Sequence, residues 1–448
     1  MVVMPTGMGK SLCYQIPALM LDQAHGDVTI VLSPLIALMQ DQVDALNRKG
    51  IDATFINSSL DRATRLSRHR AVADGRHPLL YVTPERFRKP EFRECLAARR
   101  VRLLAVDEAH CVSQWGHDFR PDYSRLQEIR TLLGDPTTIA LTATATAECR
   151  EDILVQLGID AKDVRLFHEG IDRPNLKLDV LTVFDEAEKL ERLPVSLKDP
   201  NHAGGRVIVY FSLIKTLLRF SEALTAERID HVAYHGDLPR NVRRRVQDDF
   251  MNGDADVVLA TPAFGMGVDK DDIRMVIHAE TPGSIESYYQ EIGRAGRDGR
   301  PSRCVWMYDQ HDLMTQMQFI EWSNPDAEFY GRLFDTLRDQ REQCEAFGLE
   351  WLNQKLQRVS RHDHRLATSL AMLDRHGVIA GPMPPQCFRL RADSLPEHFV
   401  DEENLSRKKR RDQQRLYEMV KFAATPPQDR QAFLNRYFLG EPGEAGRS

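Results

Sequence analysis

A short stretch at the start of the chain has the residue types that hold phosphate groups. Residues 4–11 read Met-Pro-Thr-Gly-Met-Gly-Lys-Ser and follow two valines. Gly7 and Gly9 permit a tight turn that aims backbone N–H groups at phosphate oxygens. Lys10 supplies a positive charge beside them, and Ser11 offers a hydroxyl to Mg²⁺. Because a methionine stands where the general phosphate-loop pattern has its first glycine, an ordinary turn between a strand and a helix stays open as the alternative.

Two carboxylates follow an apolar run later in the chain. Asp107 and Glu108 come directly after it, and carboxylates at the end of a parallel strand face the ligand crevice of an α/β sheet. Asp107 can hold Mg²⁺ through water, and Glu108 can orient and deprotonate an attacking water. Hydroxyls of residues 142–146, at the end of another expected strand, can hydrogen-bond the loop at residues 107–110 and report the state of a bound phosphate. A solvated acidic turn is the alternative.

Two arginines stand three residues apart in the second half. Residues 288–299 read Tyr-Tyr-Gln-Glu-Ile-Gly-Arg-Ala-Gly-Arg-Asp-Gly, which places Arg294 and Arg297 on one face if the stretch is helical. If that face meets the first half of the chain, the arginines can neutralise charge on a transferring phosphoryl group. Such arginines contribute roughly 10³–10⁵ in rate. A surface helix with salt bridges is the alternative.

An aromatic stretch follows the carboxylates. Residues 111–123 combine Trp115, His117, Phe119 and Arg120 with a glycine and a proline. Aromatic rings together with arginine form a stacking platform for unpaired bases. The same rings could instead belong to the core.

Length and composition limit the kind of protein. The chain has 448 residues, 42% of them hydrophobic, which predicts a globular protein of two or three domains. We expect no membrane span and no secretion signal, because no apolar run is long enough and no leader pattern opens the chain. Seven dispersed cysteines without a C-x-x-C pair suit a reducing cytoplasm and argue against a zinc site with four cysteines. The net charge of −6 gives no support to a nucleic-acid partner, so such binding must rely on local patches.

Apolar runs alternate with helix-like segments over most of the chain. This alternation predicts two α/β domains with parallel sheets flanked by helices. A linker is expected at residues 170–175. The expected strands are residues 28–32, 53–56, 79–82, 103–106 and 138–141, then 207–211, 231–234, 257–260, 275–278 and 304–307.

Strands are no longer expected beyond residue 309. The pattern predicts helices over residues 327–381 and a hairpin after them, so we expect either a winged helix or a small helical cap. The basic run at residues 407–411 opens a last helical segment. The predicted domains are residues 1–170, 171–310, 311–405 and 406–448.

Taken together, these stretches resemble the RecQ family of superfamily-two DNA helicases. The resemblance rests on residues 4–11, 33–36, 81–86, 107–110, 113–123, 142–146, 260–270 and 287–299. It implies two RecA-like domains with ATP in the cleft between them, and 3′→5′ movement on single-stranded DNA that unwinds duplexes. The implied cofactors and partners are ATP, Mg²⁺, and single-stranded and branched DNA, and the implied location is the cytoplasm, with the nucleoid. Protein partners cannot be inferred.

The resemblance also assigns roles to residues. Nucleotide binding would fall to Thr6, Gly7, Met8, Gly9, Lys10, Ser11 and Asp269. Metal binding would fall to Ser11 and Asp107. Catalysis would fall to Asp107, Glu108, Gln290, Arg294 and Arg297, with Arg297 as the arginine finger. DNA would be coupled to hydrolysis by Trp115, His117, Phe119 and Arg120.

Departures from the family pattern keep other functions open. The segment that reads adenine ahead of the phosphate loop is absent, so we expect a truncated N-terminus and weak selectivity for the base. Residues 428–441 resemble the start of the family's zinc module, but Asp429 stands in place of its first cysteine, so we expect no zinc. The alternatives are a DNA-stimulated ATPase that does not separate strands and a DNA-binding adaptor with an inactive ATPase.

Overall fold

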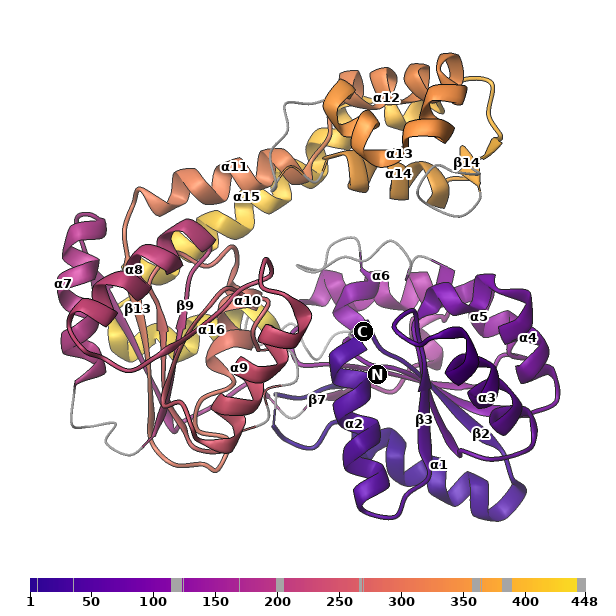
Figure 1. Ribbon diagram of the computed structural model, residues 1–448, viewed down its shortest axis with the longest axis horizontal. Coiled ribbons are helices and arrows are strands. Elements are labelled where there is room, and N and C mark those ends of the chain that lie inside the picture. The colour runs from indigo at the N-terminus through magenta and orange to yellow at the C-terminus, as the bar shows by residue number, and fades with distance from the viewer. Residues whose placement is uncertain are drawn as a thin grey trace. The chain divides into compact units, whose positions relative to one another are not determined.

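The computed structural model describes most of the chain and forms two compact units. It covers residues 1–5, 7–34, 36–113, 123, 125–168, 170–198, 205–265, 268, 270–356, 363, 365–380 and 389–440. The first unit comprises residues 1–309 together with the chain from residue 422 onward, and the second comprises residues 310–421. The first unit contains two parallel sheets, and the second is mainly helical (Figure 1).

The first sheet has seven parallel strands among the described residues, in the order β3-β4-β2-β5-β6-β1-β7. The strands are β1 (Val2–Val3), β2 (Val28–Leu32), β3 (Ala53–Ile56), β4 (Leu79–Val82), β5 (Val101–Val106), β6 (Thr137–Thr142) and β7 (Phe167–His168). The helices are α1 (Leu12–His25), α2 (Ile36–Arg48), α3 (Arg62–Ala73), α4 (Pro90–Ala97), α5 (Leu126–Leu132) and α6 (Ala147–Leu157).

Side chains of the central strands point alternately to the two faces of the first sheet, so its core has two parts. In β2, Ile30 and Leu32 pack with side chains of α3 to α6, whereas Val31 packs with side chains of α1 and α2. A strand that is buried on both faces needs an unbroken apolar sequence, which explains the Val-Thr-Ile-Val-Leu run of β2. Because all strands are parallel, their carboxyl ends share one edge, and the loops that follow β1, β5 and β6 lie there.

The second sheet has six parallel strands among the described residues, in the order β10-β11-β9-β12-β13-β8. The strands are β8 (Leu176–Thr182), β9 (Arg206–Tyr210), β10 (Val232–Tyr234), β11 (Val257–Ala260), β12 (Ile273–His278) and β13 (Ser302–Tyr308). The helices are α7 (Glu186–Leu197), α8 (Ile214–Ala226), α9 (Arg240–Asn252) and α10 (Ile285–Ile292). Apolar side chains of α7 and α8 cover one face.

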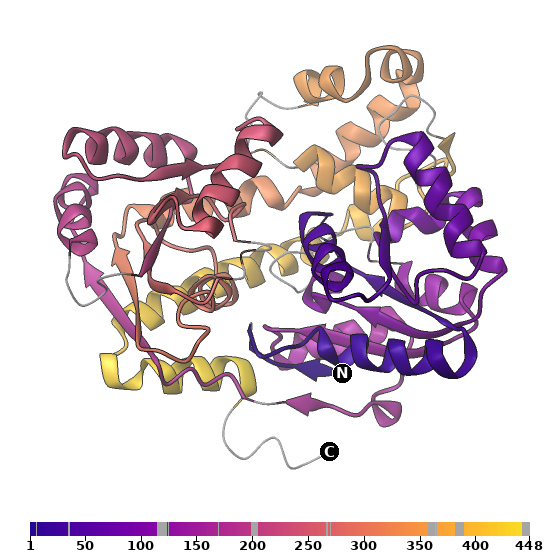
Figure 2. The same ribbon diagram turned by 60° about the horizontal axis from the view of Figure 1, so that its bottom comes forward.

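The end of the chain returns to the second sheet. The last residues of α15 (Glu402–Ala424) place Phe422 against Trp306, with ring centroids 6.4 Å apart. In α16 (Arg430–Leu439), Arg430 donates to the carbonyl oxygen of Leu178 in β8 at 2.7 Å. Figure 2 shows this yellow helix beside the sheet. The boundary expected at residue 406 therefore falls inside α15, whose last turn belongs to the first unit.

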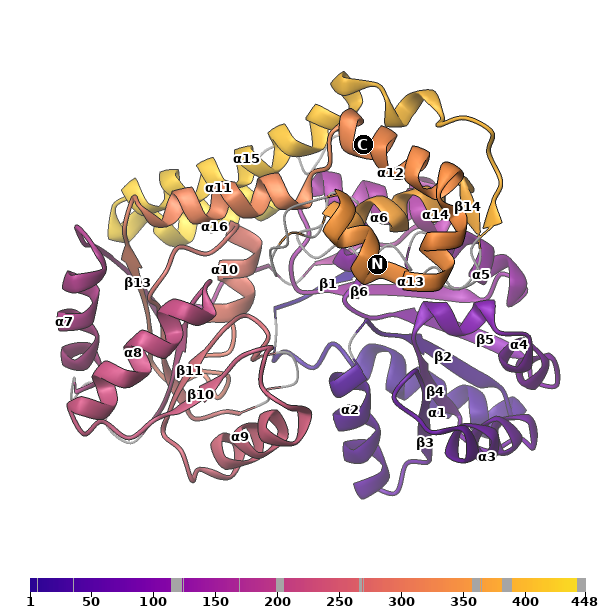
Figure 3. The ribbon, with the colours of Figure 1, turned by 45° about the horizontal axis from the view of Figure 1, so that its top comes forward.

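The second unit is built from helices and one pair of short strands among its described residues. Its elements are α11 (Asp312–Ser323), α12 (Ala327–Asp339), α13 (Arg341–Leu356), α14 (Arg365–Arg375), β14 (Ile379–Ala380), β15 (Arg389–Leu390) and most of α15. The antiparallel β14–β15 pair follows four helices, α11 to α14, and the winged helix stays a prediction. Figure 3 shows α11 and α15 side by side, joined by a 2.7 Å ion pair between Lys409 and Glu321.

The predicted fold class is confirmed. All ten expected strands are present, each within two residues of its predicted ends. The sequence analysis missed β7 and β8, which it assigned to the end of the first domain and to the region after the linker. No helix in the described part of the chain is long and apolar enough to cross a membrane. The cytoplasmic, nucleoid-associated location stays a prediction.

Candidate functional site

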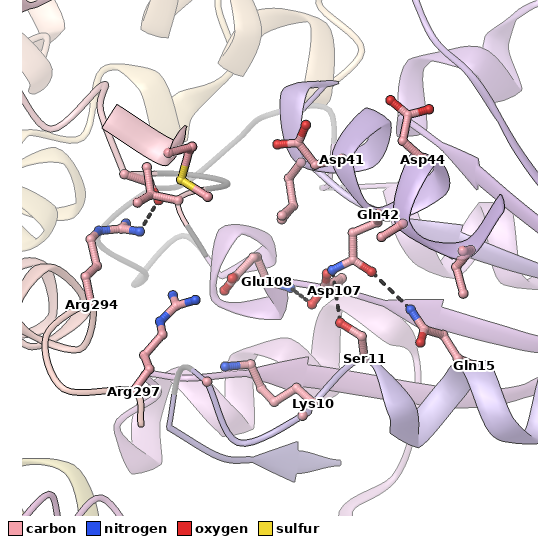
Figure 4. Close-up of a pocket in the computed structure, with 18 of the residues that line it drawn as sticks. Lys10, Ser11, Gln15, Asp41, Gln42, Asp44, Asp107, Glu108, Arg294 and Arg297 are labelled. Atoms are coloured by element: carbon pink, nitrogen blue, oxygen red, sulfur yellow. Dashed lines mark hydrogen bonds between the residues drawn. The ribbon is translucent and has the colours of Figure 1, made fainter. Parts of the chain in front are cut away.

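A cavity of about 1200 Å³ in the first unit gathers most of the residues predicted to act in chemistry (Figure 4). Its walls come from loops at the first sheet, from α2, from α9 and from the region around α10. Nine predicted site residues line it: Gly7, Gly9, Lys10, Ser11, Asp107, Glu108, Gln290, Arg294 and Arg297. Side chains from residues almost 290 positions apart in the sequence are therefore brought to one place.

The loop between β1 and α1 has the backbone that its glycines predict. Gly7 and Gly9 have φ of 89° and 79°, a region that other residues rarely adopt. The ammonium group of Lys10 donates to the carbonyl oxygen of Met4 at 3.1 Å, and Ser11 directly precedes α1, without a capping hydrogen bond from its side chain. The half-exposed Met8 is not among the residues that line the cavity. Thr6 lies outside the described residues.

The two carboxylates follow β5 directly, as predicted. The N–H of Asp107 donates to the carbonyl oxygen of Leu32 at 2.8 Å, and its Oδ1 accepts from the N–H of Glu108 at 3.0 Å. Glu108 has left-handed backbone angles, φ 48° and ψ 47°, and such strain in a residue with a side chain often marks a functional site. Burial and the charge of Glu108 raise the pKa of Asp107 to about 7, whereas Lys10 opposes this shift.

The predicted hydrogen bond between the acidic loop and the end of β6 is confirmed. Nδ1 of His110 lies 3.1 Å from the hydroxyl oxygen of Thr142. That hydroxyl donates to the carbonyl oxygen of Thr144 at 3.1 Å, so it accepts from His110. His110 Nδ1 also lies 3.4 Å from Oε2 of Glu108. A movement at the end of β6 can therefore reach the carboxylate through a single side chain.

The prediction that the two arginines share a helix face is wrong. Helix α10 ends at Ile292, and both arginines lie in the turns that follow it. Gly296, whose φ is 57°, donates to the carbonyl oxygen of Ile273 in β12 at 2.9 Å, which draws the chain away from a helical path. Both arginines still line the cavity, but they reach it from a turn rather than from a helix.

The two arginines have different surroundings. Arg294 is buried and donates to the carbonyl oxygen of Gly265 in the segment after β11. Gly265 has a φ of 137°, which L side chains rarely adopt, and a Cβ atom there would lie 2.6 Å from Cζ of Arg294, whose side chain would have to move. The side chain of Arg297 passes the phosphate loop, because a Cβ on Gly7 would lie 3.3 Å from its Cγ. Arg297 also lowers the pKa of Lys10, after the larger effect of burial.

The sequence analysis missed the contribution of two helices to the cavity. Polar side chains of α2 and α9 line it, among them Asp41, Gln42, Asp44, Gln247 and Asp248. Burial, followed by the charges of Asp44 and Asp248, raises the pKa of Asp41. Both helices contain several polar residues, so the sequence carried no signal that singled these side chains out.

Several predicted residues fall outside the part of the chain that the structure describes. These are Asp269 and the four residues of the aromatic stretch, Trp115, His117, Phe119 and Arg120. Among the described residues, no group of three or more His, Cys, Asp or Glu side chains is arranged to hold a metal ion. Cys387, His362 and His364 are not described, so the absence of zinc stays a prediction.

Comparison with known proteins identifies the class. Residues 1–152 match the DEAD/DEAH box helicase family, and residues 187–299 match the helicase conserved C-terminal domain. Each match covers most of one parallel sheet, and together they define a tandem RecA-like helicase fold, as predicted.

Curated relatives identify the family. A Bacillus subtilis protein named as a probable ATP-dependent DNA helicase RecS is 40% identical over 347 residues, which cover 77% of this chain and 67% of the relative. The ATP-dependent DNA helicase RecQ of the same organism is 45% identical over 72% of this chain and 53% of the relative. The chain belongs to the RecQ family. It spans about half the length of the RecQ proteins of B. subtilis (53%) and Haemophilus influenzae (49%).

Solved structures share the fold. The helicase MrfA bound to DNA has a TM-score of 0.57 and 19% identity, over 88% of this chain and 58% of that chain. The Mycobacterium smegmatis helicase Lhr, bound to single-stranded DNA and AMP-PNP, has a TM-score of 0.55 and 23% identity, over 71% of this chain and 45% of that chain. At these identities the likeness concerns the fold alone.

Proposed function

We propose that the chain is an ATP-dependent DNA helicase that moves 3′→5′ on single-stranded DNA and unwinds duplexes. One observation carries the proposal: a single cavity joins the phosphate loop and the carboxylates of the first sheet to Arg297 near the second. Membership of the RecQ family supports the same activity, because the relatives are named as ATP-dependent DNA helicases.

The residues present fit a nucleotide with Mg²⁺. The buried carboxylate of Asp107, whose pKa burial raises, would be stabilised by a cation beside it. The cavity is large enough for a nucleotide, and Lys10 now bonds only to a carbonyl of its own loop among the described partners. Ser11 would hold Mg²⁺ directly and Asp107 through water. Bound there, the ion supplies positive charge to the β- and γ-phosphate oxygens.

Each remaining side chain has a role that its position supports. The glycines let the loop backbone surround the phosphates, and Lys10 neutralises part of their charge. Glu108 orients the attacking water and accepts its proton. Arg297 stabilises the charge that develops on the transferring group. Gln290 contributes a polar contact from α10. Asp269 lies outside the described residues, and its nucleotide contact rests on the family resemblance alone.

The aromatic stretch is proposed as the coupling between DNA and hydrolysis. It begins one residue after His110, so it is covalently tied to the carboxylate loop. A base stacked on Trp115 or Phe119 could contribute about 1–3 kcal/mol, and Arg120 could meet a DNA phosphate. DNA would then favour the loop position in which Glu108 is ready to act.

The test of the proposed function is strand separation. Forked and 3′-tailed duplexes should be unwound when ATP and Mg²⁺ are present, and 5′-tailed duplexes should not. Lys10→Ala should abolish hydrolysis and unwinding and leave single-stranded DNA binding largely intact, because Lys10 faces phosphates of the nucleotide. Hydrolysis without unwinding would point to a translocase, and DNA binding without hydrolysis by the wild type would point to an adaptor.

The coupling role has its own test. Trp115→Ala or Arg120→Ala should lose most of the stimulation of ATP hydrolysis by single-stranded DNA and keep the basal rate. A thermal melt provides the control, because loss of a core aromatic would lower the melting temperature strongly. Full DNA stimulation in both variants would contradict the coupling role.

A further inference from the structure

We propose that Gln42 is a positioning residue that orients the Ser11 hydroxyl and thereby sets how strongly a divalent cation strengthens nucleotide binding. This inference rests on the proposed function, since it concerns the same site. It adds a residue of α2, a helix that the sequence analysis did not connect with the chemistry.

The geometry around Gln42 is the basis of the inference. Its Nε2 donates to the hydroxyl oxygen of Ser11 at 3.0 Å. Its Oε1 faces three donors: Nε2 of Gln15 at 3.1 Å, the hydroxyl of Tyr14 at 3.2 Å and the hydroxyl of Tyr81 at 3.3 Å. Figure 4 shows Gln42 between Ser11 and Gln15.

The surroundings of the amide fix which end points to Ser11. Tyr14 and Tyr81 are 0% and 1% exposed. Phenols keep their protons at neutral pH, so both hydroxyls can donate. A carbonyl oxygen placed among three donors is the favourable orientation of the Gln42 amide, and this orientation leaves its N–H groups for Ser11.

The hydrogen bond from Gln42 determines what Ser11 can still do. A hydroxyl has one proton and two lone pairs. When one lone pair accepts from Gln42, the other lone pair and the proton are left for the cavity side. The oxygen can then coordinate a cation while its proton points to a phosphate oxygen. Without Gln42 the Ser11 hydroxyl would retain only its contact with the phenol of Tyr14, and ordering it toward the cavity would weaken cation binding.

The helix that carries Gln42 is firmly attached to the first sheet. Its residues Met39, Val43 and Leu46 are buried in the core cluster that also contains Val31 of β2. Ser11 is therefore held by a helix other than its own, and the carbonyl of Leu32 at the end of β2 holds Asp107. The two proposed metal contacts are fixed through β2 and the helix that follows it.

The test separates metal-dependent from metal-independent binding. The affinity of a fluorescent ATP analogue is measured with Mg²⁺ and with EDTA, and bound Mn²⁺ is measured in parallel by electron paramagnetic resonance. Gln42→Met keeps the length of the side chain and removes the donor. Gln40→Met, on the same helix but not among the residues that line the cavity, is the matched control.

We expect the gain in affinity on adding Mg²⁺ to be about 3- to 10-fold smaller in Gln42→Met than in wild type, the size expected for one neutral hydrogen bond. Affinity in EDTA should be unchanged, and Gln40→Met should behave as wild type. If Gln42→Met melts far below wild type, Gln42→Asn, whose shorter side chain cannot reach Ser11, takes its place.

Two results would overturn the inference. One is a Mg²⁺ gain equal to that of wild type. The other is an equal loss of affinity with and without Mg²⁺, which would make Gln42 a support of the loop rather than of the metal. Failure of the wild type to bind nucleotide at all would instead refute the proposed function.

Discussion

The loops at the two sheets contribute to one cavity in different ways. Near the first sheet the functional side chains follow their strands almost at once: Asp107 is the first residue after β5, and the phosphate loop starts one residue after β1. Near the second sheet Arg294 and Arg297 lie beyond α10, in turns tied down by contacts with Gly265, β12 and the phosphate loop. The first set is positioned mainly by the strand ends that it follows, and the second by turns that depend on contacts with distant segments.

The way in which each set is held suits a different chemical role. Glu108 and Asp107 are held by backbone geometry and a strand carbonyl, which suits groups that must keep a water and a metal in fixed places. The arginine turn depends on packing between distant segments, which suits a group that must respond to movement. We therefore expect substitutions in the first set to affect chemistry alone, and substitutions around the second to affect chemistry and stability together.

The largest effect is expected for Arg297→Ala. Loss of the charge that stabilises the transferring phosphoryl group should slow single-turnover ATP hydrolysis by roughly 10³–10⁵-fold. Binding of a non-hydrolysable analogue should change little, because the arginine acts mainly in the transition state. If the variant hydrolyses ATP at the wild-type rate, Arg297 near the second sheet takes no part in hydrolysis.

A somewhat smaller effect is expected for Glu108→Gln. The amide keeps the shape of the side chain but cannot accept a proton, so hydrolysis should fall by roughly 10²–10⁴-fold. Melting temperature and nucleotide affinity should stay close to wild type, as expected for a site positioned by local geometry. A large loss of stability would contradict the expectation that substitutions in the first set affect chemistry alone.

The smallest effect is expected for Gly265→Ala. The added Cβ would lie 2.6 Å from Cζ of Arg294, and the φ of 137° is strained for alanine. We expect about a tenfold loss of hydrolysis together with a destabilisation of about 1–3 kcal/mol, the cost of one strained backbone position.

The matched control for that variant is Gly236→Ala, whose Cβ would have no heavy atom within 4 Å. It should leave both hydrolysis and the melting temperature unchanged. If Gly265→Ala behaves in the same way as Gly236→Ala, the arginine turn does not depend on Gly265, and the contrast between the two sheets fails.

The sequence predicted the elements that carry their own local signal. Buried parallel strands are nearly unbroken apolar runs, so β2, β4 and β5 were readily found. Strand β8 reads Leu-Lys-Leu-Asp-Val-Leu-Thr and lies at the edge of its sheet, and its charged residues interrupt the apolar run that would have marked it as a strand. Tertiary pairing with β13, not the local sequence, makes it a strand.

The same distinction holds within the site. The phosphate loop and the carboxylates were predicted because their residues are adjacent in sequence and follow strands. The helix face of the arginines was predicted wrongly, because spacing alone does not show that Gly296 bonds to β12 and interrupts the helix. Gln42 could not have been found, since only the fold brings it 3.0 Å from Ser11.

The most direct test of the central claim, that both sheets act on one nucleotide, is a double-mutant cycle on single-turnover ATP hydrolysis. Glu108→Asp and Arg297→Lys keep their charges, so the double variant should remain measurable. If both groups act on one transition state, the loss of rate in the double variant should differ by more than about fivefold from the product of the two single losses of rate. Agreement with that product within about twofold, as for distant independent sites, would contradict the account.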